Sequence, residues 1–261
     1  MISPFSASSK SPDTGPVSVW THLLAALQFI TVIPIRRSVP FVPSRMIPMF
    51  PVVGLILGAG LVAVDGVASL LWSRPVASLL DVVFLVAVTG GFHLDGLGDT
   101  ADGLYGHRSR EAALAIMKDS RVGAMGLLAM VCGLGIKWAG IAELDAHRTL
   151  MLFIIPAYSR GAMLFGFRYL PYGRPEGGTG HAFFDDPLPP SGLVWLLPAV
   201  LLSLLAGPAA IIVNLAFAGL VIAVLTAYAR RIGCITGDML GAQCEITEAG
   251  LFLLVTAGGL A

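Results

Sequence analysis

The residues with the clearest chemical potential are three aspartates that follow a long apolar run. Asp95, Asp99 and Asp102 stand at positions i, i+4 and i+7 within GGFHLDGLGDTADGL, residues 90–104. If this segment is helical, the three carboxylates lie along one side of the helix. Three such charges repel one another, and a divalent cation is the simplest compensation. Because Mg²⁺ binds a few carboxylates together with substrate phosphate oxygens, the spacing predicts a Mg²⁺ site rather than a solvated acidic loop.

The same segment holds a histidine and several glycines. His93 is a candidate proton acceptor near neutral pH, with a purely structural role as the alternative. The glycines lower helix propensity, so the helix is expected to break among the acids and to let its backbone approach a ligand.

A second group of candidates follows in IMKDSRVG, residues 116–123. Lys118 and Arg121 suit pyrophosphate oxygens, and Arg can bind them through two N–H groups at once. Asp119 is a further candidate metal ligand, and Ser120 lies between them as a candidate substrate-binding residue. The alternative for the two cations is simple anchoring at the membrane edge.

Two later segments add weaker candidates. In PEGGTG, residues 175–180, Gly178 and Gly180 are candidate phosphate-binding positions, although a plain flexible loop fits equally well. In TGDMLGAQCE, residues 236–245, Gly237 and Asp238 are candidate substrate-binding residues. Asp238 and Glu245 are seven residues apart, so together they could complete the metal site from one helix face.

The elements that must position these residues are membrane helices. Of 261 residues, 56% are hydrophobic and only 12% are charged, too few for a soluble surface of this size. The sequence predicts one all-α integral membrane domain over residues 1–261, with a polar tail at 1–16 and a bundle of about seven to eight helices. The expected spans are 17–33, 47–72, 76–91, 122–143, 149–169, 191–206, 209–229 and 249 to the end.

The loop charges indicate an orientation. Alternate loops, residues 36–45, 92–121, 170–190 and 230–248, hold most of the cations, which places them in the cytoplasm with both chain ends outside. The acidic candidates fall on the same side. Arg160 lies within a span, where a charge is costly, and is expected to face the site, whereas Lys137 is expected to reach the bilayer edge. The net charge of zero gives no indication of nucleic acid binding.

Taken together, GFHLDGLGDTADG, MKDSRVG and TGDMLGA resemble the cobalamin synthase family, adenosylcobinamide-GDP ribazoletransferase, over nearly the whole chain. The resemblance implies a multi-pass enzyme of the bacterial inner membrane that uses Mg²⁺. It also implies the substrates adenosylcobinamide-GDP and α-ribazole, or α-ribazole 5′-phosphate, with adenosylcobalamin or its 5′-phosphate and GMP as products. On this basis Asp95, Asp99 and Asp102 are expected to hold Mg²⁺, and His93 or an aspartate to take the hydroxyl proton.

Two other classes remain open from the sequence. DTADG matches the start of the CDP-alcohol phosphotransferase signature, but that signature continues with AlaArg, whereas Gly103 is followed by LYGHR. An ion transporter would also use membrane acids, but its site is expected near the bilayer midplane rather than at one interface. The oligomeric state is left open.

Overall fold

A computed structural model describes residues 18–174 and 180–257, and within this part of the chain the regular elements are all helical. One isolated β-bridge joins Tyr172 and Ile235. In chain order the α-helices are α1 (Val19–Ile30), α2 (Pro43–Met46), α3 (Phe50–Leu71), α4 (Arg74–Thr89), α5 (Phe92–Leu104), α6 (Arg110–Ile116), α7 (Ala124–Glu143), α8 (Arg148–Tyr169), α9 (Leu197–Ser203), α10 (Ala209–Arg231) and α11 (Gly237–Val255). Short 3-10 turns are η1 (Ile47–Met49), η2 (His181–Phe183), η3 (Pro190–Leu196) and η4 (Leu204–Ala206).

The all-helical membrane prediction is confirmed, with differences in the spans. Four helical stretches are long and apolar enough to cross a bilayer: Pro43–Leu71, Ala124–Glu143, Arg148–Tyr169 and Ala209–Arg231. The pair α4 and α5 adds a fifth if it counts as one span, but it bends by 90°. α1 has 12 residues, about 18 Å of helix, which is too short for the span expected at 17–33. α11 begins at Gly237, well before the last span expected from residue 249.

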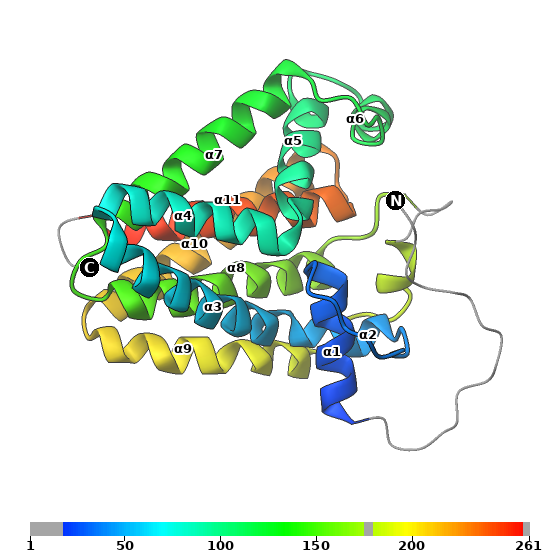
Figure 1. Cartoon of the computed structure of the whole chain (residues 1–261). Coiled ribbons are helices and arrows are strands. Elements are labelled where there is room, and N and C mark those ends of the chain that lie inside the picture. Colours follow the sequence, from blue (N-terminus) through cyan, green and yellow to red (C-terminus); the bar gives the residue numbers. More distant parts are fainter. Residues whose placement is uncertain (1–17, 175–179, 258–261) are drawn as a thin grey trace.

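Polar connections gather at one end of the bundle. In Figure 1 the long helices run roughly side by side, while α1 and α5 lie across one end and α6 projects beyond it. The connections at residues 31–49, 90–123 and 232–236 lie at this end, as do residues 170–174 and 180–196, and we call it the polar end. The sequence-based grouping of alternate loops is therefore correct for these segments, except that residues 237–248 belong to α11.

The interior is tightly packed around α8, much of whose length is buried. α3 lies directly against it: a Cβ added at Gly54 would come within 2.3 Å of the Pro156 carbonyl oxygen. Small residues allow membrane helices to approach this closely, and the contact gains dispersion energy that lipid cannot supply. This packing fixes the two central helices on which the polar end is built.

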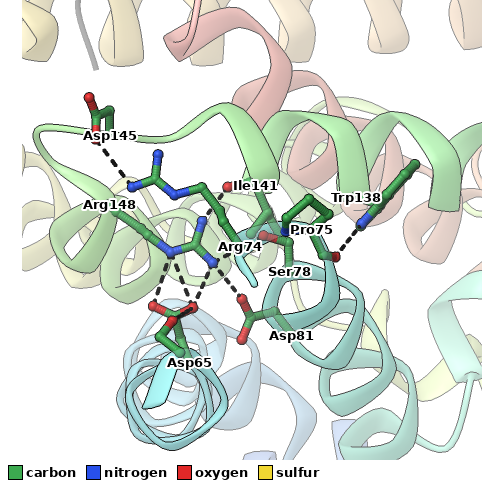
Figure 2. A network of polar contacts seen from close by, with 10 residues as sticks. Asp65, Arg74, Pro75, Ser78, Asp81, Trp138, Ile141, Asp145 and Arg148 are labelled. Carbon is green, nitrogen blue, oxygen red and sulfur yellow. Dashed lines mark hydrogen bonds and ion pairs between the residues drawn. The ribbon is translucent and has the colours of Figure 1, made fainter. Parts of the chain in front are cut away.

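The opposite end of the bundle is held by a largely buried arginine (Figure 2). Arg148, the first residue of α8, donates to Asp65 of α3 at 2.6 Å, and to Ser78 and Asp81 of α4 at 3.1 and 3.0 Å. It also donates to the backbone carbonyl of Ile141 in α7. One guanidinium thus joins four helices, and its burial makes each partner important to stability.

Candidate active site

The three aspartates of the first motif lie on an unbroken helix. Gly90 and Gly91 both adopt positive φ, 62° and 72°, which ends α4 and turns the chain into α5. Glycine suits this turn because other residues avoid such angles. α5 then continues from Phe92 to Leu104, so the expected break lies before the acids rather than among them. The predicted alignment of Asp95, Asp99 and Asp102 along one helix therefore holds.

The first turn of α11 brings a fourth carboxylate to α5. A Cβ at Gly96 would lie 2.6 Å from the Asp238 carbonyl oxygen, so the two backbones approach closely at this point. Asp238 consequently lies near enough to Asp95 and Asp99 for mutual repulsion. We call Asp95, Asp99 and Asp238 the acidic face. Asp95 is exposed, whereas the other two are half-buried.

The acidic face carries excess negative charge. Burial, followed by repulsion from Asp95 and then Asp238, raises the pKa of Asp99 to about 6. Burial also raises the pKa of Asp238, although the nearby Arg174 opposes this change. Such raised pKa values indicate carboxylates held together against their repulsion, a pattern that occurs at functional sites and in structural ion networks.

Arg174 is the cation that faces this cluster. Its Nη2 donates to Asp238 Oδ2 at 2.8 Å. Its Nε is buried, and no hydrogen-bond acceptor lies within reach of it among the described residues. An unsatisfied buried donor costs free energy, so this nitrogen is suited to an incoming anion. Arg174 falls in the cation-bearing segment 170–190 but was not among the residues predicted for the site; its position just before the glycine-rich segment was the available signal.

Asp102 has different partners from the other two aspartates of α5. Its Oδ2 accepts a hydrogen bond from the Gly123 backbone N–H at 2.7 Å, and its Oδ1 accepts one from Gly126 N–H at 2.8 Å. Gly123 is the N-cap residue of α7 and Gly126 lies in its first turn, so Asp102 caps that helix from a distance. The two motifs predicted to act together are thus physically joined through this carboxylate.

The second motif forms the loop before α7. Arg121 and Asp119 pair through a contact of 2.5 Å, and hydrogen bonds from Arg121 lower the pKa of Asp119. A cavity of about 630 Å³ opens here, with Asp102, Arg108, Asp119 and Arg121 among its lining residues. Lys118 and Ser120 are exposed on the same loop. The arrangement places cations beside the α7 N-terminus, which favours anions.

His93 is on α5 but on the buried side of that helix. Its ring is fully buried, and neither ring nitrogen has a hydrogen-bond partner within the described chain. Gly241 of α11 lies over its backbone: a Cβ there would be 3.2 Å from the His93 Cα. This position separates His93 from the exposed Asp95, so a direct proton transfer from substrate suits the aspartate better.

Arg160 lies in a buried ion network inside the bundle. Its Nη1 contacts the Glu248 carboxylate and Ser159 Oγ. Lys137 donates to Glu245 at 2.6 Å and to Glu248 at 2.7 Å, so it is buried rather than extended to the bilayer edge. Glu245, expected to complete the metal site, instead pairs with Lys137 because α11 is already helical at this position. The network joins α7, α8 and α11.

The remaining predicted positions are glycines. Gly237 is the first residue of α11 and immediately precedes Asp238. Gly180 packs against Tyr172, whose hydroxyl would lie 2.6 Å from an added Cβ. Gly178 lies outside the described residues.

The metal-binding potential of the site resides in the acidic face. Within residues 18–174 and 180–257, no three His, Cys, Asp or Glu side chains are arranged as a ready set of metal ligands. The acidic face offers hard oxygen donors from two helices, together with the charge excess noted above. This donor chemistry fits Mg²⁺, which keeps several waters and takes only one or two carboxylates plus phosphate oxygens.

Comparison with known proteins gives consistent matches over almost the full length. A family model described as cobalamin-5-phosphate synthase matches residues 22–256. A protein of Alkaliphilus metalliredigens named adenosylcobinamide-GDP ribazoletransferase is 40% identical over 249 residues, 92% of this chain and 97% of the relative. Relatives of the same name from Roseiflexus sp. and Chlorobaculum tepidum are each 38% identical and cover 85% and 89% of this chain, and 84% and 93% of their own lengths. No solved structure matches the chain.

Proposed function

The chain belongs to the cobalamin-5-phosphate synthase family and is a transferase of cobalamin synthesis, and we propose that its acidic face binds the diphosphate of adenosylcobinamide-GDP together with Mg²⁺. The observation that carries this proposal is the juxtaposition of half-buried Asp99 and Asp238 with Arg174, whose Nε lacks an acceptor among the described residues. A diphosphate and a divalent cation would satisfy both the excess carboxylate charge and the unused donor.

The reaction follows from the names of the relatives. A hydroxyl of α-ribazole, or of α-ribazole 5′-phosphate, attacks the phosphorus that is joined to cobinamide. A new P–O bond forms, the P–O bond to the GMP portion breaks, and GMP leaves with the bonding electrons. With the phosphorylated acceptor the product is adenosylcobalamin 5′-phosphate, in agreement with the description of the family.

Each residue near the diphosphate has a distinct role in this proposal. Asp99 and Asp238 would hold Mg²⁺, which supplies charge neutralisation on the phosphate oxygens. Asp95, the exposed carboxylate of the acidic face, accepts the hydroxyl proton. Arg174 donates to the phosphate through Nε while keeping its pair with Asp238. Preorganised groups that stabilise the charge developing on the phosphate oxygens account for most of the rate enhancement expected at such a site.

Lys118 and Arg121 act at the neighbouring cavity. Asp102 fixes the first turn of α7, and with it the loop that carries both cations. Arg121 lines the cavity and Lys118 is exposed beside it, so both can attract an anionic substrate to the polar end.

We place the polar end in the cytoplasm of a bacterial inner membrane because its loops hold most of the Lys and Arg residues. Labelling tests this orientation. A cysteine introduced by Ala115→Cys on exposed α6, in a chain lacking the native cysteines, should react with a membrane-impermeant reagent only in inside-out vesicles. Equal reaction in intact cells would place the site outside.

The activity itself is tested with purified, detergent-solubilised protein. Adenosylcobinamide-GDP, α-ribazole and Mg²⁺ should yield adenosylcobalamin and GMP in equal amounts, and EDTA should stop both. CDP-alcohol in place of adenosylcobinamide-GDP is the specificity control and should yield no CMP. If the protein releases no GMP when both substrates and Mg²⁺ are present, the proposal is wrong.

A further inference from the structure

A second pocket at the polar end has the features of a nucleobase site, an assignment that rests on the proposed function. This pocket has a volume of about 440 Å³ and lies between the end of α8 and the segment around η2. Tyr172, His181, Phe184 and Asp186 are among its lining residues, and we call it the aromatic pocket. Arg168 Nη1 donates to the Leu188 carbonyl at 2.7 Å, which holds the η2 segment against α8.

The walls of the aromatic pocket are flat rings that lie close together. Tyr172 and Phe184 are stacked, with ring centroids 4.9 Å apart and planes at 27°. His181 lies 6.1 Å from Tyr172 and is tilted by 36°. His181 and Tyr172 are both partly accessible, so they can offer ring faces to a ligand. Nucleobases bind to such aromatic side chains by stacking on their ring faces.

Backbone hydrogen bonds hold the aromatic pocket beside the acidic face. Gly173 N–H donates to the Ile235 carbonyl at 2.8 Å, and Ile235 N–H donates to the Pro171 carbonyl at 3.0 Å. Tyr172 lies between these two contacts. Two residues later, Arg174 pairs with Asp238. Tyr172 is also close enough to both charges for them to influence its pKa, which burial raises. One nucleotide can therefore place its base in the pocket and its phosphates at Arg174.

A carboxylate at the pocket distinguishes between the two bases of the reaction. Asp186 lines the pocket and is exposed, and an ionised carboxylate accepts hydrogen bonds without donating any. Guanine presents two donors on one edge, N1–H and the 2-amino group. The base of α-ribazole, bonded to ribose through one ring nitrogen, has no N–H donor. We propose that the aromatic pocket binds the guanine of the GDP portion and that Asp186 accepts hydrogen bonds from N1–H and the 2-amino group.

Nucleotide binding by the full-length protein in nanodiscs, with Mg²⁺ present, tests this assignment. The probes are GMP, IMP, which lacks the 2-amino group, and XMP, which has a carbonyl at that position. Loss of a hydrogen bond to a charged acceptor lowers affinity by about 10- to 100-fold. The wild type should therefore bind GMP about 10- to 100-fold more tightly than IMP. Asp186→Asn should abolish this preference and improve XMP binding, because its amide can donate to the xanthine carbonyl.

Asp185→Asn is the matched control. Asp185 is also exposed, but its Oδ1 lies 3.6 Å from His181 Nε2. This variant should keep the GMP preference. Equal binding of GMP and IMP by the wild type, or an unchanged preference in Asp186→Asn, would overturn the assignment, as would a lack of GMP binding. Transferase activity of the same preparation, measured with adenosylcobinamide-GDP, separately reports whether the proposed function holds.

Discussion

Asp99 and Asp102 are three residues apart on one helix, yet only substitution of Asp102 should lower the stability of the fold. Asp102 accepts hydrogen bonds from two backbone N–H groups at the N-terminus of α7, at 2.7 and 2.8 Å. For Asp99, by contrast, burial and then repulsion from its carboxylate neighbours raise the pKa to about 6. Removing the charge at Asp102 therefore deletes favourable contacts, whereas removing it at Asp99 relieves repulsion.

The magnitude for Asp102→Ala follows from the two lost contacts. Hydrogen bonds to charged groups contribute about 1.5–3 kcal/mol each, and loss of a helix cap costs about 0.5–2 kcal/mol. Water reaches this half-buried position and recovers part of the loss, so we expect a free energy of unfolding lower by about 2–4 kcal/mol. Asp99→Asn should unfold at the same denaturant concentration as the wild type, or slightly later.

Chemical unfolding in mixed micelles, followed by tryptophan fluorescence, measures both variants under one condition. The matched third variant is Asp95→Asn, which is exposed on the same helix and should leave the unfolding free energy unchanged within about 0.5 kcal/mol. If Asp102→Ala unfolds as the wild type does while Asp99→Asn is strongly destabilised, the division of roles along α5 is wrong.

Three further predictions concern ion pairs elsewhere in the chain. Asp65→Asn should lower the unfolding free energy by about 3 kcal/mol because it weakens the largely buried ion pair with Arg148. Asp145→Asn, which removes a charge from the exposed pair with Arg74, should change it by less than about 1 kcal/mol in the same unfolding assay. Glu248→Gln should destabilise by about 3–5 kcal/mol, seen as a lower unfolding midpoint, because two buried cations lose a shared carboxylate. Arg174→Gln should raise the KM for adenosylcobinamide-GDP by about 10- to 100-fold without lowering the unfolding midpoint, and an unchanged KM would contradict its phosphate role.

Local patterns predicted the parts of this structure that depend on local physics. Apolar length indicated the four helices long enough to cross a bilayer, loop cations indicated which connections share a side, and the 3.6-residue period aligned the carboxylates of α5. The helix was expected to break among the glycines of the motif, but α5 is continuous there because it packs against α11 and α7. Tertiary contacts thus outweighed the low helix propensity of glycine.

Contacts between distant segments could not be predicted from spacing. In the sequence nothing distinguishes Asp102 from Asp99. Asp102 acts as a cap because the fold places the N-terminus of α7, some twenty residues later in the chain, against its carboxylate. Glu245 and Glu248 appeared to lie in a polar loop, because their charges lowered the apparent hydropathy of what is in fact helix α11. Their partner Lys137 is more than one hundred residues away in the chain. Arg174 was overlooked for the same reason, since its partner Asp238 is brought to it by the fold.

The central claim is that Asp99 and Asp238 act with Mg²⁺ on the diphosphate of adenosylcobinamide-GDP. The most direct measurement is GMP release as a function of Mg²⁺ concentration, for the wild type and for Asp99→Asn in matched, folded preparations. We predict that wild-type release rises from zero to saturation with Mg²⁺, and that the variant is at least about 1,000-fold slower at every concentration, a loss of about 4 kcal/mol of transition-state stabilisation. Full release by the thoroughly chelated wild-type protein, or an unimpaired variant, would contradict the claim.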